Sequence, residues 1–496
     1  MTGAVDPRQP VLVGAGQLSN RVDRGAPPLE PADLMAEALR LAEADSGGTG
    51  LLAKADAVRV INELSWRYRN CPALVAERVG ASPRQVLYTV MGGNYVQTLV
   101  NRSALDIANG DADVILLAGG EAWRTRTAAR KADHDLGWTE QPEDTPPPEH
   151  YGSDESLSAP EEVARGVFMP VQLYPIFEVA LRAAGGLGVE EHRARIAGLW
   201  SRFSEVAASN PHAWIQQAFT PAEIATPSPD NRMVGFPYTK RMNSNNMVEQ
   251  GAALIMCSAA AAEAAGVPRD RWVFPHAGTD AHDHWFVSQR ENLHSSPAIR
   301  LAGRTALELA GIGPDDLAHV DLYSCFPSAV QIAADELGLG LDRQLTVTGG
   351  LSFAGGPWNN YVMHGIATMT AVLRDDPGAV GLCSANGGYI TKHAFGVYGT
   401  EPPADGFRWR DLQDQVDALP RREVLAEHDG PVTIEAYTVM HDRDGAPEAG
   451  LVASLTADGR RMWANTHDDD LMRAMCDEEW VGRTATVAAD GALHPS

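Results

Sequence analysis

The stretch from Val86 to Glu121 constrains the fold of this chain more than any other. It begins with an apolar, β-branched run, Val86–Val90, which predicts a buried strand, and continues through a turn at Gly92-Gly93-Asn94. Apolar residues then recur at near-helical spacing until Asn109-Gly110, a typical helix end. A second apolar run, Asp113–Gly119, predicts another buried strand. We therefore expect a strand, a glycine turn, a buried helix and a strand in the middle of an α/β core.

The glycine turn of this stretch lies at the N-terminus of the predicted helix. Exposed backbone amides and the positive end of the helix dipole favour an anion or a thiolate at such a place. An enzyme could hold an activated cysteine there, yet the stretch contains no cysteine. The chain thus combines an arrangement suited to a thiolate with the absence of the thiol.

Length, charge and cysteine usage exclude several classes of function. A chain of 496 residues is long enough for two to four domains. The formal charge of −25 argues against nucleic acid or an acidic membrane as the main partner, but it leaves room for a small anion in a local basic pocket. The five cysteines are scattered without a CxxC pair, which favours reduced thiols over a disulfide framework or a zinc ribbon.

The sequence also carries no signs of export or membrane insertion. Its N-terminus lacks a basic-plus-apolar signal segment. No apolar run approaches the roughly 20 residues that a membrane-spanning helix needs. We therefore expect a cytoplasmic protein without a membrane span.

From Ser296 onward the chain repeats the pattern of its first half. Pro297–Ala310 is an alanine-rich helical segment that resembles Pro31–Ala44, and a helical pattern at Ala329–Leu337 corresponds to Cys71–Val79. The other expected elements of the second half are the strands Val320–Tyr323 and Val380–Cys383, the segment Thr346–Leu351 as a strand before a glycine turn, and the buried helix Tyr361–Leu373. A duplicated α/β unit is the simplest explanation.

The last part of the chain has a different pattern. A charged connector, Asp411–Ala426, precedes short runs in which apolar residues alternate with polar ones, beginning at Val432. Asp-Gly dipeptides at 444–445, 458–459 and 490–491 are typical of hairpin turns. These features predict a small antiparallel barrel of OB-like size.

Six short motifs, in their order along the chain, resemble the thiolase superfamily. They are VLVGAGQ at 11–17, LLAGGEA at 116–122, GAALIMCSAAAAEAAG at 251–266, VDLYSCF at 320–326, GGPW at 355–358 and CSANGG at 383–388. The resemblance covers roughly residues 8–400. It points to the sterol-carrier-protein type of thiolase and to the actinobacterial group called thiolase-like protein type 1. It implies a duplicated five-layer α/β/α/β/α core whose ligand is coenzyme A or an acyl-CoA.

The resemblance also implies a division into domains. Residues 1–122 would form the N-terminal thiolase half, and residues 123–250 the loop domain that covers the ligand cleft. Residues 251–400 would form the C-terminal half, although their first strand and helix belong to the N-terminal core. Residues 401–426 would be a connector, and residues 427–496 an additional β-barrel like the OB-fold domains that accompany some thiolases.

Thiolase chemistry needs a thiolate at the N-terminus of a buried helix and a histidine that deprotonates it. It also needs a second cysteine that moves the α-proton, and oxyanion holes. When the catalytic motifs of thiolases are matched onto this chain, the position of the nucleophilic cysteine falls on Gly92, or at best on Met91. The position of the serine that follows it falls on Asn94. The histidine position falls on Gly356, and only the second cysteine has a counterpart, Cys383. The resemblance therefore implies the fold without ordinary thiolase catalysis.

Other side chains could take over the missing roles. The candidate catalytic pair is Cys383 with His364, although a helix-cap or core role for this histidine is favoured over a catalytic base. Cys325 could replace the nucleophile, but we favour a packing role. Tyr323 could donate to an oxyanion, but a hydroxyl already satisfied inside the protein is the preferred interpretation.

Candidate ligand-binding residues lie in two places. Lys240 and Arg241, in the covering loop, are the best candidates for the phosphates of coenzyme A by family position, although a surface ion pair explains them nearly as well. Asn94 is a third candidate, at the glycine turn. The histidines and aspartates between residues 276 and 284 are of metal-binding types, but their spacing favours a solvated loop, and we expect no metal: His276, Asp280, His282, Asp283 and His284.

Three hypotheses of function follow. The favoured one is a thiolase-like protein of lipid metabolism that binds coenzyme A or acyl-CoA without thiolase activity. The second is an active acetyl-CoA acetyltransferase or other acyl-CoA acyltransferase with relocated catalytic groups. The third is a scaffold or interaction module that binds a partner protein through the C-terminal barrel. Because thiolases usually form dimers, the resemblance also implies a homodimer.

Overall fold

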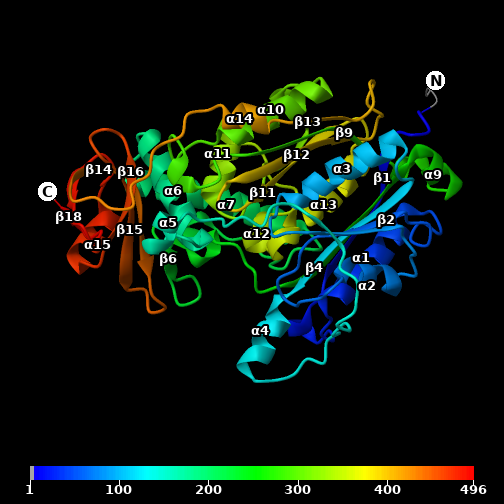
Figure 1. Ribbon diagram of the computed structural model, residues 1–496, viewed down its shortest axis with the longest axis horizontal. Helices are drawn as coiled ribbons and strands as arrows, with labels where there is room; N and C mark the ends of the chain where they lie inside the picture. Colours follow the sequence, from blue (N-terminus) through cyan, green and yellow to red (C-terminus); the bar gives the residue numbers. More distant parts are fainter. Residues whose placement is uncertain (1–4, 496) are drawn as a thin grey trace.

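The computed structural model describes residues 5–495 and contains two sheets in its central region (Figure 1). The first is six-stranded, in the order β1, β8, β4, β2, β3, β5. The strands β2, β3 and β4 are parallel, whereas β8 runs antiparallel between β1 and β4. The bounds are β1 (Pro10–Ser19), β2 (Ala57–Val60), β3 (Gln85–Thr89), β4 (Val114–Ala122), β5 (Glu149–Tyr151) and β8 (Glu249–Ser258).

The second sheet is five-stranded, in the order β10, β11, β12, β9, β13. Its centre is an antiparallel set, because β12 pairs antiparallel with both β11 and β9. The bounds are β9 (Phe274–His282), β10 (His319–Asp321), β11 (Val380–Gly387), β12 (Lys392–Gly399) and β13 (Arg408–Asp411).

Helices form three layers around these two sheets. The helices α1 (Pro31–Ser46) and α2 (Cys71–Arg78) cover the outer face of the first sheet, and α10 (Pro297–Ala310), beside α11 (Pro327–Leu337), covers the outer face of the second. Between the sheets lie α3 (Tyr95–Asn109) and α13 (Tyr361–Asp375), which contact strands of both. The five-layer α/β/α/β/α core expected from the resemblance is confirmed.

The sequence explains why α3 takes the central position. Most residues of the helix are buried, and its buried polar side chains make hydrogen bonds inside the protein: Gln97 to Asn101, Thr98 to Asp280 and Ser103 to the carbonyl of Leu99. Gly110 ends it in the left-handed conformation, with a φ of 86°. At its other end the turn Gly92-Gly93-Asn94 joins it to β3, as the sequence predicts.

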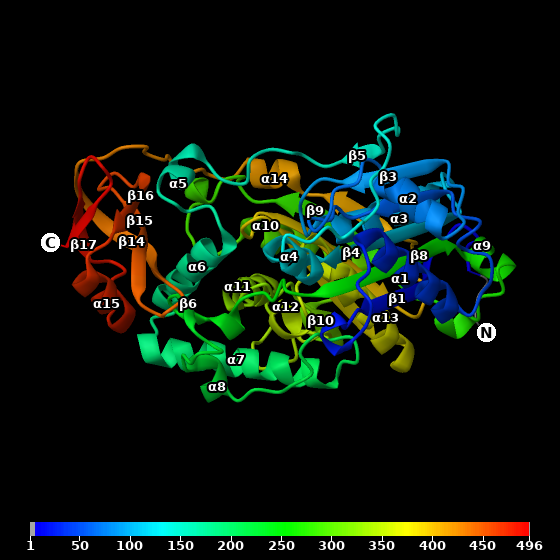
Figure 2. The same cartoon turned by 90° about the horizontal axis from the view of Figure 1, so that it is seen from below.

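The long segment between β4 and β8 contains short elements rather than irregular chain alone. In Figure 2, α6 lies beside the C-terminal sheet and α7 runs along the lower side of the molecule. The bounds are α4 (Trp123–Lys131), α5 (Pro160–Ala164), α6 (Pro170–Ala184), α7 (Val189–Ser209), α8 (Pro221–Ala225), β6 (Met233–Gly235), β7 (Tyr238–Thr239) and the 3-10 helix η2 (Lys240–Met242). Elsewhere in the core lie α9 (Ala259–Ala264), α12 (Gly350–Phe353) and α14 (Gln413–Asp417).

The C-terminal part is an antiparallel sheet, as predicted, but its strands do not close into a barrel. One edge of β14 pairs with β15, and the other pairs first with β17 and then with β6 from the middle of the chain. The end strands β16 and β18 are linked by one isolated bridge, Asn465–Ala492, in the described part of the chain. The bounds are β14 (Gly430–His441), β15 (Pro447–Leu455), β16 (Arg461–Thr466), α15 (Asp469–Asp477), β17 (Thr484–Val487) and β18 (Leu493–Pro495). The strands β17 and β18 are short, with 4 and 3 residues, and no continuous ladder joins β18 to β16 in the described chain.

Two local predictions are wrong. Thr346–Leu351, expected as a strand, is a loop and the start of α12, because Thr346, Val347 and Thr348 turn to donate hydrogen bonds to the buried carboxylate of Asp321. The solvated loop expected around residues 276–284 is largely the strand β9, in the middle of the second sheet. Among residues 5–495, no helix is long and apolar enough to cross a membrane.

Candidate functional site

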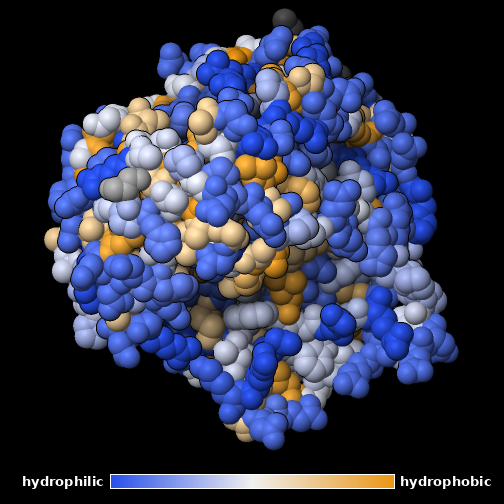
Figure 3. All heavy atoms as spheres, turned by 60° about the vertical axis from the view of Figure 1, so that its left-hand side comes forward, coloured by the Kyte–Doolittle hydropathy of each residue, from blue (hydrophilic) through white to orange (hydrophobic). Residues whose placement is uncertain are grey.

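A cavity of about 300 Å³ lies where the glycine turn before α3 meets the second half of the core. We call it the central cavity. It is formed by segments that are far apart in the sequence: Met91–Gly93, Met169–Val171 with Tyr174, Asn243–Asn246, Tyr323–Phe326, Gly356–Asn359 and Asn386–Tyr389. Most of the surface in Figure 3 is hydrophilic, and apolar side chains gather around a hollow in the middle of that face. Because Gly92 and Gly93 line it, the central cavity lies at the glycine turn predicted from the sequence.

The glycine turn is held from two sides. The backbone N–H of Gly92 donates to the side-chain oxygen of Asn359 (3.1 Å), and the ammonium group of Lys392 donates to the carbonyl of Met91 (2.9 Å). There is little room for side chains on the turn. A Cβ atom at Gly93 would lie 2.6 Å from the carbonyl oxygen of Asn386 and 3.0 Å from the hydroxyl of Tyr323.

The central cavity contains one thiol and no imidazole among its described lining residues. The thiol belongs to Cys325, whose sulfur lies 4.0 Å from the side-chain nitrogen of Asn386. Burial raises the pKa of Cys325 to about 12, so the thiol stays protonated near neutral pH. Cys325 is 7% exposed and packs within the hydrophobic core, so the packing role expected for it is compatible with its position at the cavity wall.

Two polar groups of the cavity wall lack partners inside the described protein. The hydroxyl of Tyr323 makes no hydrogen bond there, although the ring packs edge-to-face on Tyr361 with centroids 5.6 Å apart. The side-chain oxygen of Asn386 is buried without a partner, while its nitrogen donates to the Tyr174 hydroxyl (2.9 Å). The satisfied hydroxyl expected for Tyr323 is not found. Both groups are able to bind a ligand.

The structure does not bring Cys383 and His364 to this cavity. Cys383 lies within β11, where burial and the neighbouring carboxylate of Asp321 raise the pKa of its thiol well above the ordinary value. His364 lies in the first turn of α13 and contacts Gln17 through Nδ1 (3.0 Å). Burial, with a smaller contribution from His212, lowers the pKa of His364 to about 3. Neither residue lines the central cavity.

The predicted ligand-binding residues Lys240, Arg241 and Asn94 do not line the central cavity. Lys240 is exposed on η2, and the guanidinium of Arg241 donates to the carbonyl of Glu223 (2.8 Å) while lying over the ring of Phe219. The next residues, Asn243, Ser244 and Asn246, do line it. Asn94 is buried behind the turn, and its side-chain oxygen has no hydrogen-bond partner in the described chain.

The polar residues of β9 make hydrogen bonds to other parts of the protein. Asp280 accepts hydrogen bonds from Asn101 (3.0 Å) and from the indole of Trp409 (2.7 Å). His276 contacts the carbonyl of Glu401 (2.9 Å). Within residues 5–495, no group of three or more His, Cys, Asp or Glu side chains gathers closely enough to hold a metal ion.

Sequence reasoning missed three residues around the turn. Asn386 belongs to the motif CSANGG, and Asn359 directly follows the motif GGPW, so these two motifs were the available signal. Lys392 follows CSANGG by four residues and is 4% exposed. Burial lowers the pKa of Lys392 to about 8. This positive charge lies behind the turn, 5.2 Å from the ring centroid of Tyr95.

Comparison with known proteins gives two family matches. The description "Thiolase C-terminal domain-like" matches residues 279–342, and "Thiolase-like protein type 1 additional C-terminal domain" matches residues 411–492. An acetyl-CoA acetyltransferase of Methanocaldococcus jannaschii is 24% identical over 270 residues, which make up 54% of this chain and 60% of that protein. The match thus leaves out a large part of the acetyltransferase.

Solved structures give a more complete match. The Ltp2–ChsH2(DUF35) aldolase has 19% identity and a TM-score of 0.59, over 80% of this chain and 98% of the other, so it shows similarity of fold alone. A monomeric SCP2-thiolase like protein type 1 from Mycobacterium smegmatis is 33% identical with a TM-score of 0.84, over 99% of this chain and 100% of the other. The chain therefore belongs to the family of SCP2-thiolase-like proteins of type 1.

Proposed function

We propose that this protein binds an acyl thioester of coenzyme A in the central cavity and does not form an acyl-enzyme. The observation that carries the proposal is the composition of the cavity wall. It contains ligand-binding polar groups and many apolar side chains, but it lacks an imidazole near its one thiol in the described residues. An acyl-enzyme needs a thiolate, and the Cys325 thiol has no base beside it.

The surroundings of Gly92 and Gly356, the positions of the thiolase nucleophile and histidine, support this proposal. A Cβ atom at Gly92 would lie 2.6 Å from the side-chain oxygen of Asn94 and 3.0 Å from the ammonium nitrogen of Lys392. A Cβ atom at Gly356, the position of the thiolase histidine, would lie 3.0 Å from the side-chain oxygen of Asn246. A side chain at either position would thus crowd a neighbouring polar group, which would have to shift.

The wall suggests how an acyl thioester would bind. The hydroxyl of Tyr323 can donate to the thioester oxygen, because this hydroxyl has no partner within the described protein. Apolar side chains such as Leu157, Phe326 and Leu351 suit an acyl chain. Lys240 remains a candidate for the phosphates of coenzyme A, because it is exposed close to Asn243 and Ser244.

Calorimetric titration with coenzyme A and with acetoacetyl-CoA tests the proposal, alongside an assay of acetoacetyl-CoA cleavage. We expect saturable binding without cleavage. Loss of acyl-CoA affinity in Tyr323→Phe would support binding in the central cavity. Cleavage at a rate well above the uncatalysed one, or no binding of either compound, would contradict the proposal.

A second candidate function, acyl transfer through Cys325, rests on the position of this thiol at the cavity wall. In that case a bound substrate would have to supply the base that the wall lacks. The Cys325→Ser variant separates the two functions. Turnover that disappears in this variant would favour acyl transfer, whereas unchanged acyl-CoA binding without turnover favours the binding function.

We further propose that the chain is a monomer rather than the homodimer suggested by family habit. The short strand β5 pairs in parallel with β3 and so covers the edge of the first sheet at residues 87–89. A second copy would therefore have to displace β5 before it could pair with β3. Light scattering coupled to gel filtration tests this, and a mass of two chains would overturn it.

A further inference from the structure

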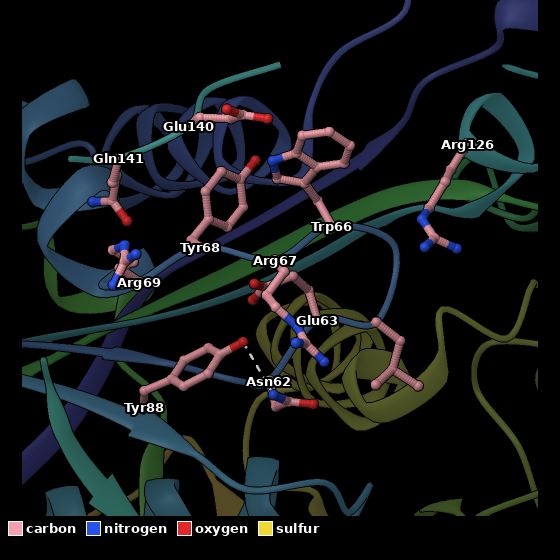
Figure 4. A pocket seen from close by; sticks show the side chains of 11 residues that line it. Asn62, Glu63, Trp66, Arg67, Tyr68, Arg69, Tyr88, Arg126, Glu140 and Gln141 are labelled. Atoms are coloured by element: carbon pink, nitrogen blue, oxygen red, sulfur yellow. Dashed lines mark hydrogen bonds between the residues drawn. The ribbon is translucent and has the colours of Figure 1, made fainter. Parts of the chain in front are cut away.

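A second and larger cavity, of about 910 Å³, lies at the carboxyl ends of β2 and β3 (Figure 4). We call it the arginine pocket. After β2 the chain continues to α2 on the outer face of the sheet, and after β3 it continues to α3 between the two sheets. Ligands of α/β proteins bind in such crevices, where two neighbouring strands send their following segments to opposite faces.

Three arginines around this pocket have guanidinium groups without an acidic partner in the described chain. Arg67 and Arg69 come from the loop after β2, and Arg126 comes from α4 (Figure 4). Their guanidinium groups form no ion pair or hydrogen bond with any residue between 5 and 495, although Arg126 lies over the ring of Trp123 and its charge partly offsets the burial that raises the pKa of Glu121. Such a cluster is unusual in a chain with a formal charge of −25. It favours a ligand with more than one negative charge.

Glu63 forms part of the wall and also lacks a partner. Its side chain is 4% exposed, and neither carboxyl oxygen makes a hydrogen bond with the described protein. Burial raises the pKa of Glu63 to about 8, so the group is mostly uncharged at neutral pH. A buried carboxyl without partners costs free energy unless a ligand group, such as a hydroxyl, completes its hydrogen bonds.

The walls of the arginine pocket are held in place without a ligand. The indole of Trp66 donates to the carbonyl of Thr139 (3.0 Å). The side chain of Gln141 binds both the N–H and the carbonyl of Asn70, at 2.8 Å and 3.1 Å. The hydroxyl of Tyr68 donates to Glu30 (2.9 Å). These contacts fix three aromatic or polar wall segments, so little ordering is needed on binding.

We propose that the arginine pocket binds a phosphorylated nucleoside, with its phosphates on Arg67, Arg69 and Arg126 and a sugar hydroxyl on Glu63. The aromatic side chains of Trp66, Tyr68 and Tyr88 line the same pocket and suit a planar base. A carboxyl at the end of the second strand that binds a sugar hydroxyl is a known arrangement in nucleotide-binding α/β folds.

The nucleotide could be free or could be the nucleotide end of coenzyme A, because the two cavities adjoin. Asn62 lines the arginine pocket, Asn359 lines the central cavity, and the side-chain nitrogen of Asn359 donates to the carbonyl of Asn62 (2.9 Å). Competition distinguishes the sources. If bound ADP weakens acyl-CoA binding, the ligand is the nucleotide end of coenzyme A; if the two bind together, it is a free nucleotide.

Calorimetry on the full chain with ADP, pyrophosphate and adenosine tests the proposal. We expect ADP and pyrophosphate to bind and adenosine to bind at least roughly tenfold more weakly, because it lacks the charge. Arg67→Gln and Arg69→Gln should each weaken ADP binding roughly tenfold. Arg130→Gln, an exposed arginine of α4 outside the pocket, is the matched control and should leave it unchanged.

A second pair of measurements addresses the role of Glu63. The Glu63→Gln variant should weaken binding of ADP but not of pyrophosphate, since the latter has no sugar. Absence of ADP binding, or equal binding by wild type and Arg67→Gln, would overturn the proposal. So would loss of ADP binding in Tyr323→Phe, which would place the nucleotide in the central cavity. Absence of ADP binding with acyl-CoA binding intact would overturn this proposal and leave the proposed function standing, whereas ADP binding without acyl-CoA binding would do the reverse.

Discussion

Tyr323 and Tyr361 pack edge-to-face with their ring centroids 5.6 Å apart, yet their hydroxyls differ completely in environment. The Tyr361 hydroxyl lies 2.6 Å from the Thr348 hydroxyl and 3.4 Å from the carboxylate of Asp321. The Tyr323 hydroxyl has no partner in residues 5–495 and lines the central cavity. The Tyr361 hydroxyl thus contributes to hydrogen bonds that stabilise the fold, whereas the Tyr323 hydroxyl is available to a ligand.

The first prediction uses this pair. Tyr323→Phe should lower acyl-CoA affinity roughly five- to tenfold, the effect of one lost hydrogen bond, and should leave the free energy of unfolding unchanged. Tyr361→Phe, the matched control, should destabilise the protein by about 1 kcal/mol and leave affinity nearly unchanged. Calorimetry and urea unfolding measure both quantities. Equal loss of affinity in the two variants would show that Tyr323 does not bind the ligand directly.

The second prediction concerns restoration of a thiolase. The double variant Gly92→Cys with Gly356→His should not cleave acetoacetyl-CoA, because the new side chains would crowd Asn94, Lys392 and Asn246 and so would not reach the geometry that catalysis needs. We expect it to be destabilised by about 1–3 kcal/mol as well, as in other overpacked sites.

Gly188→Cys is the control for this experiment, because a Cβ at this exposed position would have no atom within 4 Å. It should fold with wild-type stability and also lack cleavage activity. Cleavage by the double variant would mean that the two missing side chains are the whole difference from an active thiolase.

The third prediction concerns pH. The pKa of Glu63 is raised in the folded protein to about 8 from the ordinary value of 4.5, so the folded state keeps a proton that the unfolded state loses. Stability from this group is therefore complete below about pH 4.5 and is lost as the pH rises through 8. Between pH 5.5 and 8 the loss amounts to roughly 3 kcal/mol.

Urea unfolding at these two pH values measures the loss. Glu63→Gln, which cannot titrate, should reduce the difference by about this amount, leaving the contribution of Glu121, whose pKa burial raises to about 7. Glu140→Gln, an exposed residue of the same pocket, should retain the full difference. An identical pH dependence in wild type and Glu63→Gln would show that Glu63 is not the responsible group.

The fourth prediction concerns the additional C-terminal domain. Arg461 is fully buried, pairs with Glu435, and donates to the carbonyl of Ser288 (2.8 Å) in the core. Trp463 donates to the Ser288 hydroxyl (2.8 Å). Arg461→Met should therefore cost about 3 kcal/mol and expose the domain to proteolysis, because Glu435 and the carbonyl lose their partner.

Its neighbour Arg460, whose ion pairs with Asp458 and Glu423 are exposed to solvent, provides the control. Arg460→Met should leave both stability and protease resistance as in wild type. Hydrogen exchange that is equally slow in β14–β16 of all three proteins would contradict the anchoring role of Arg461.

Local signals in the sequence were sufficient for most of the core. The prediction of a helix at Pro297–Ala310 is confirmed to the residue, because Ser296 caps it, Pro297 starts it and Gly311 ends it in the left-handed conformation. The glycine turn and α3 were predictable for similar reasons. The strand β9 was not, since Asp280 is satisfied by Thr98, Asn101 and Trp409, which are distant in sequence.

The candidate site was harder to predict because it depends on which side of an element faces the cavity. The strand at Cys383 and the helix at His364 were expected, but the structure leaves both side chains in the interior, away from the central cavity. Cys325 follows a short strand and reaches the wall. Pairing of β10 with β11 brings Cys383 beside Asp321, in the strand that leads to Cys325, and no local pattern encodes this pairing.

Intact-protein mass spectrometry after incubation with acetoacetyl-CoA tests the central claim most directly, in a sample for which calorimetry has shown binding. We predict that the mass of the bound and then unfolded protein equals that of the untreated chain, because the cavity offers no thiolate to form a thioester. A mass increase of one acyl group, mapped to Cys325 or to any other residue of the central cavity, would contradict the account.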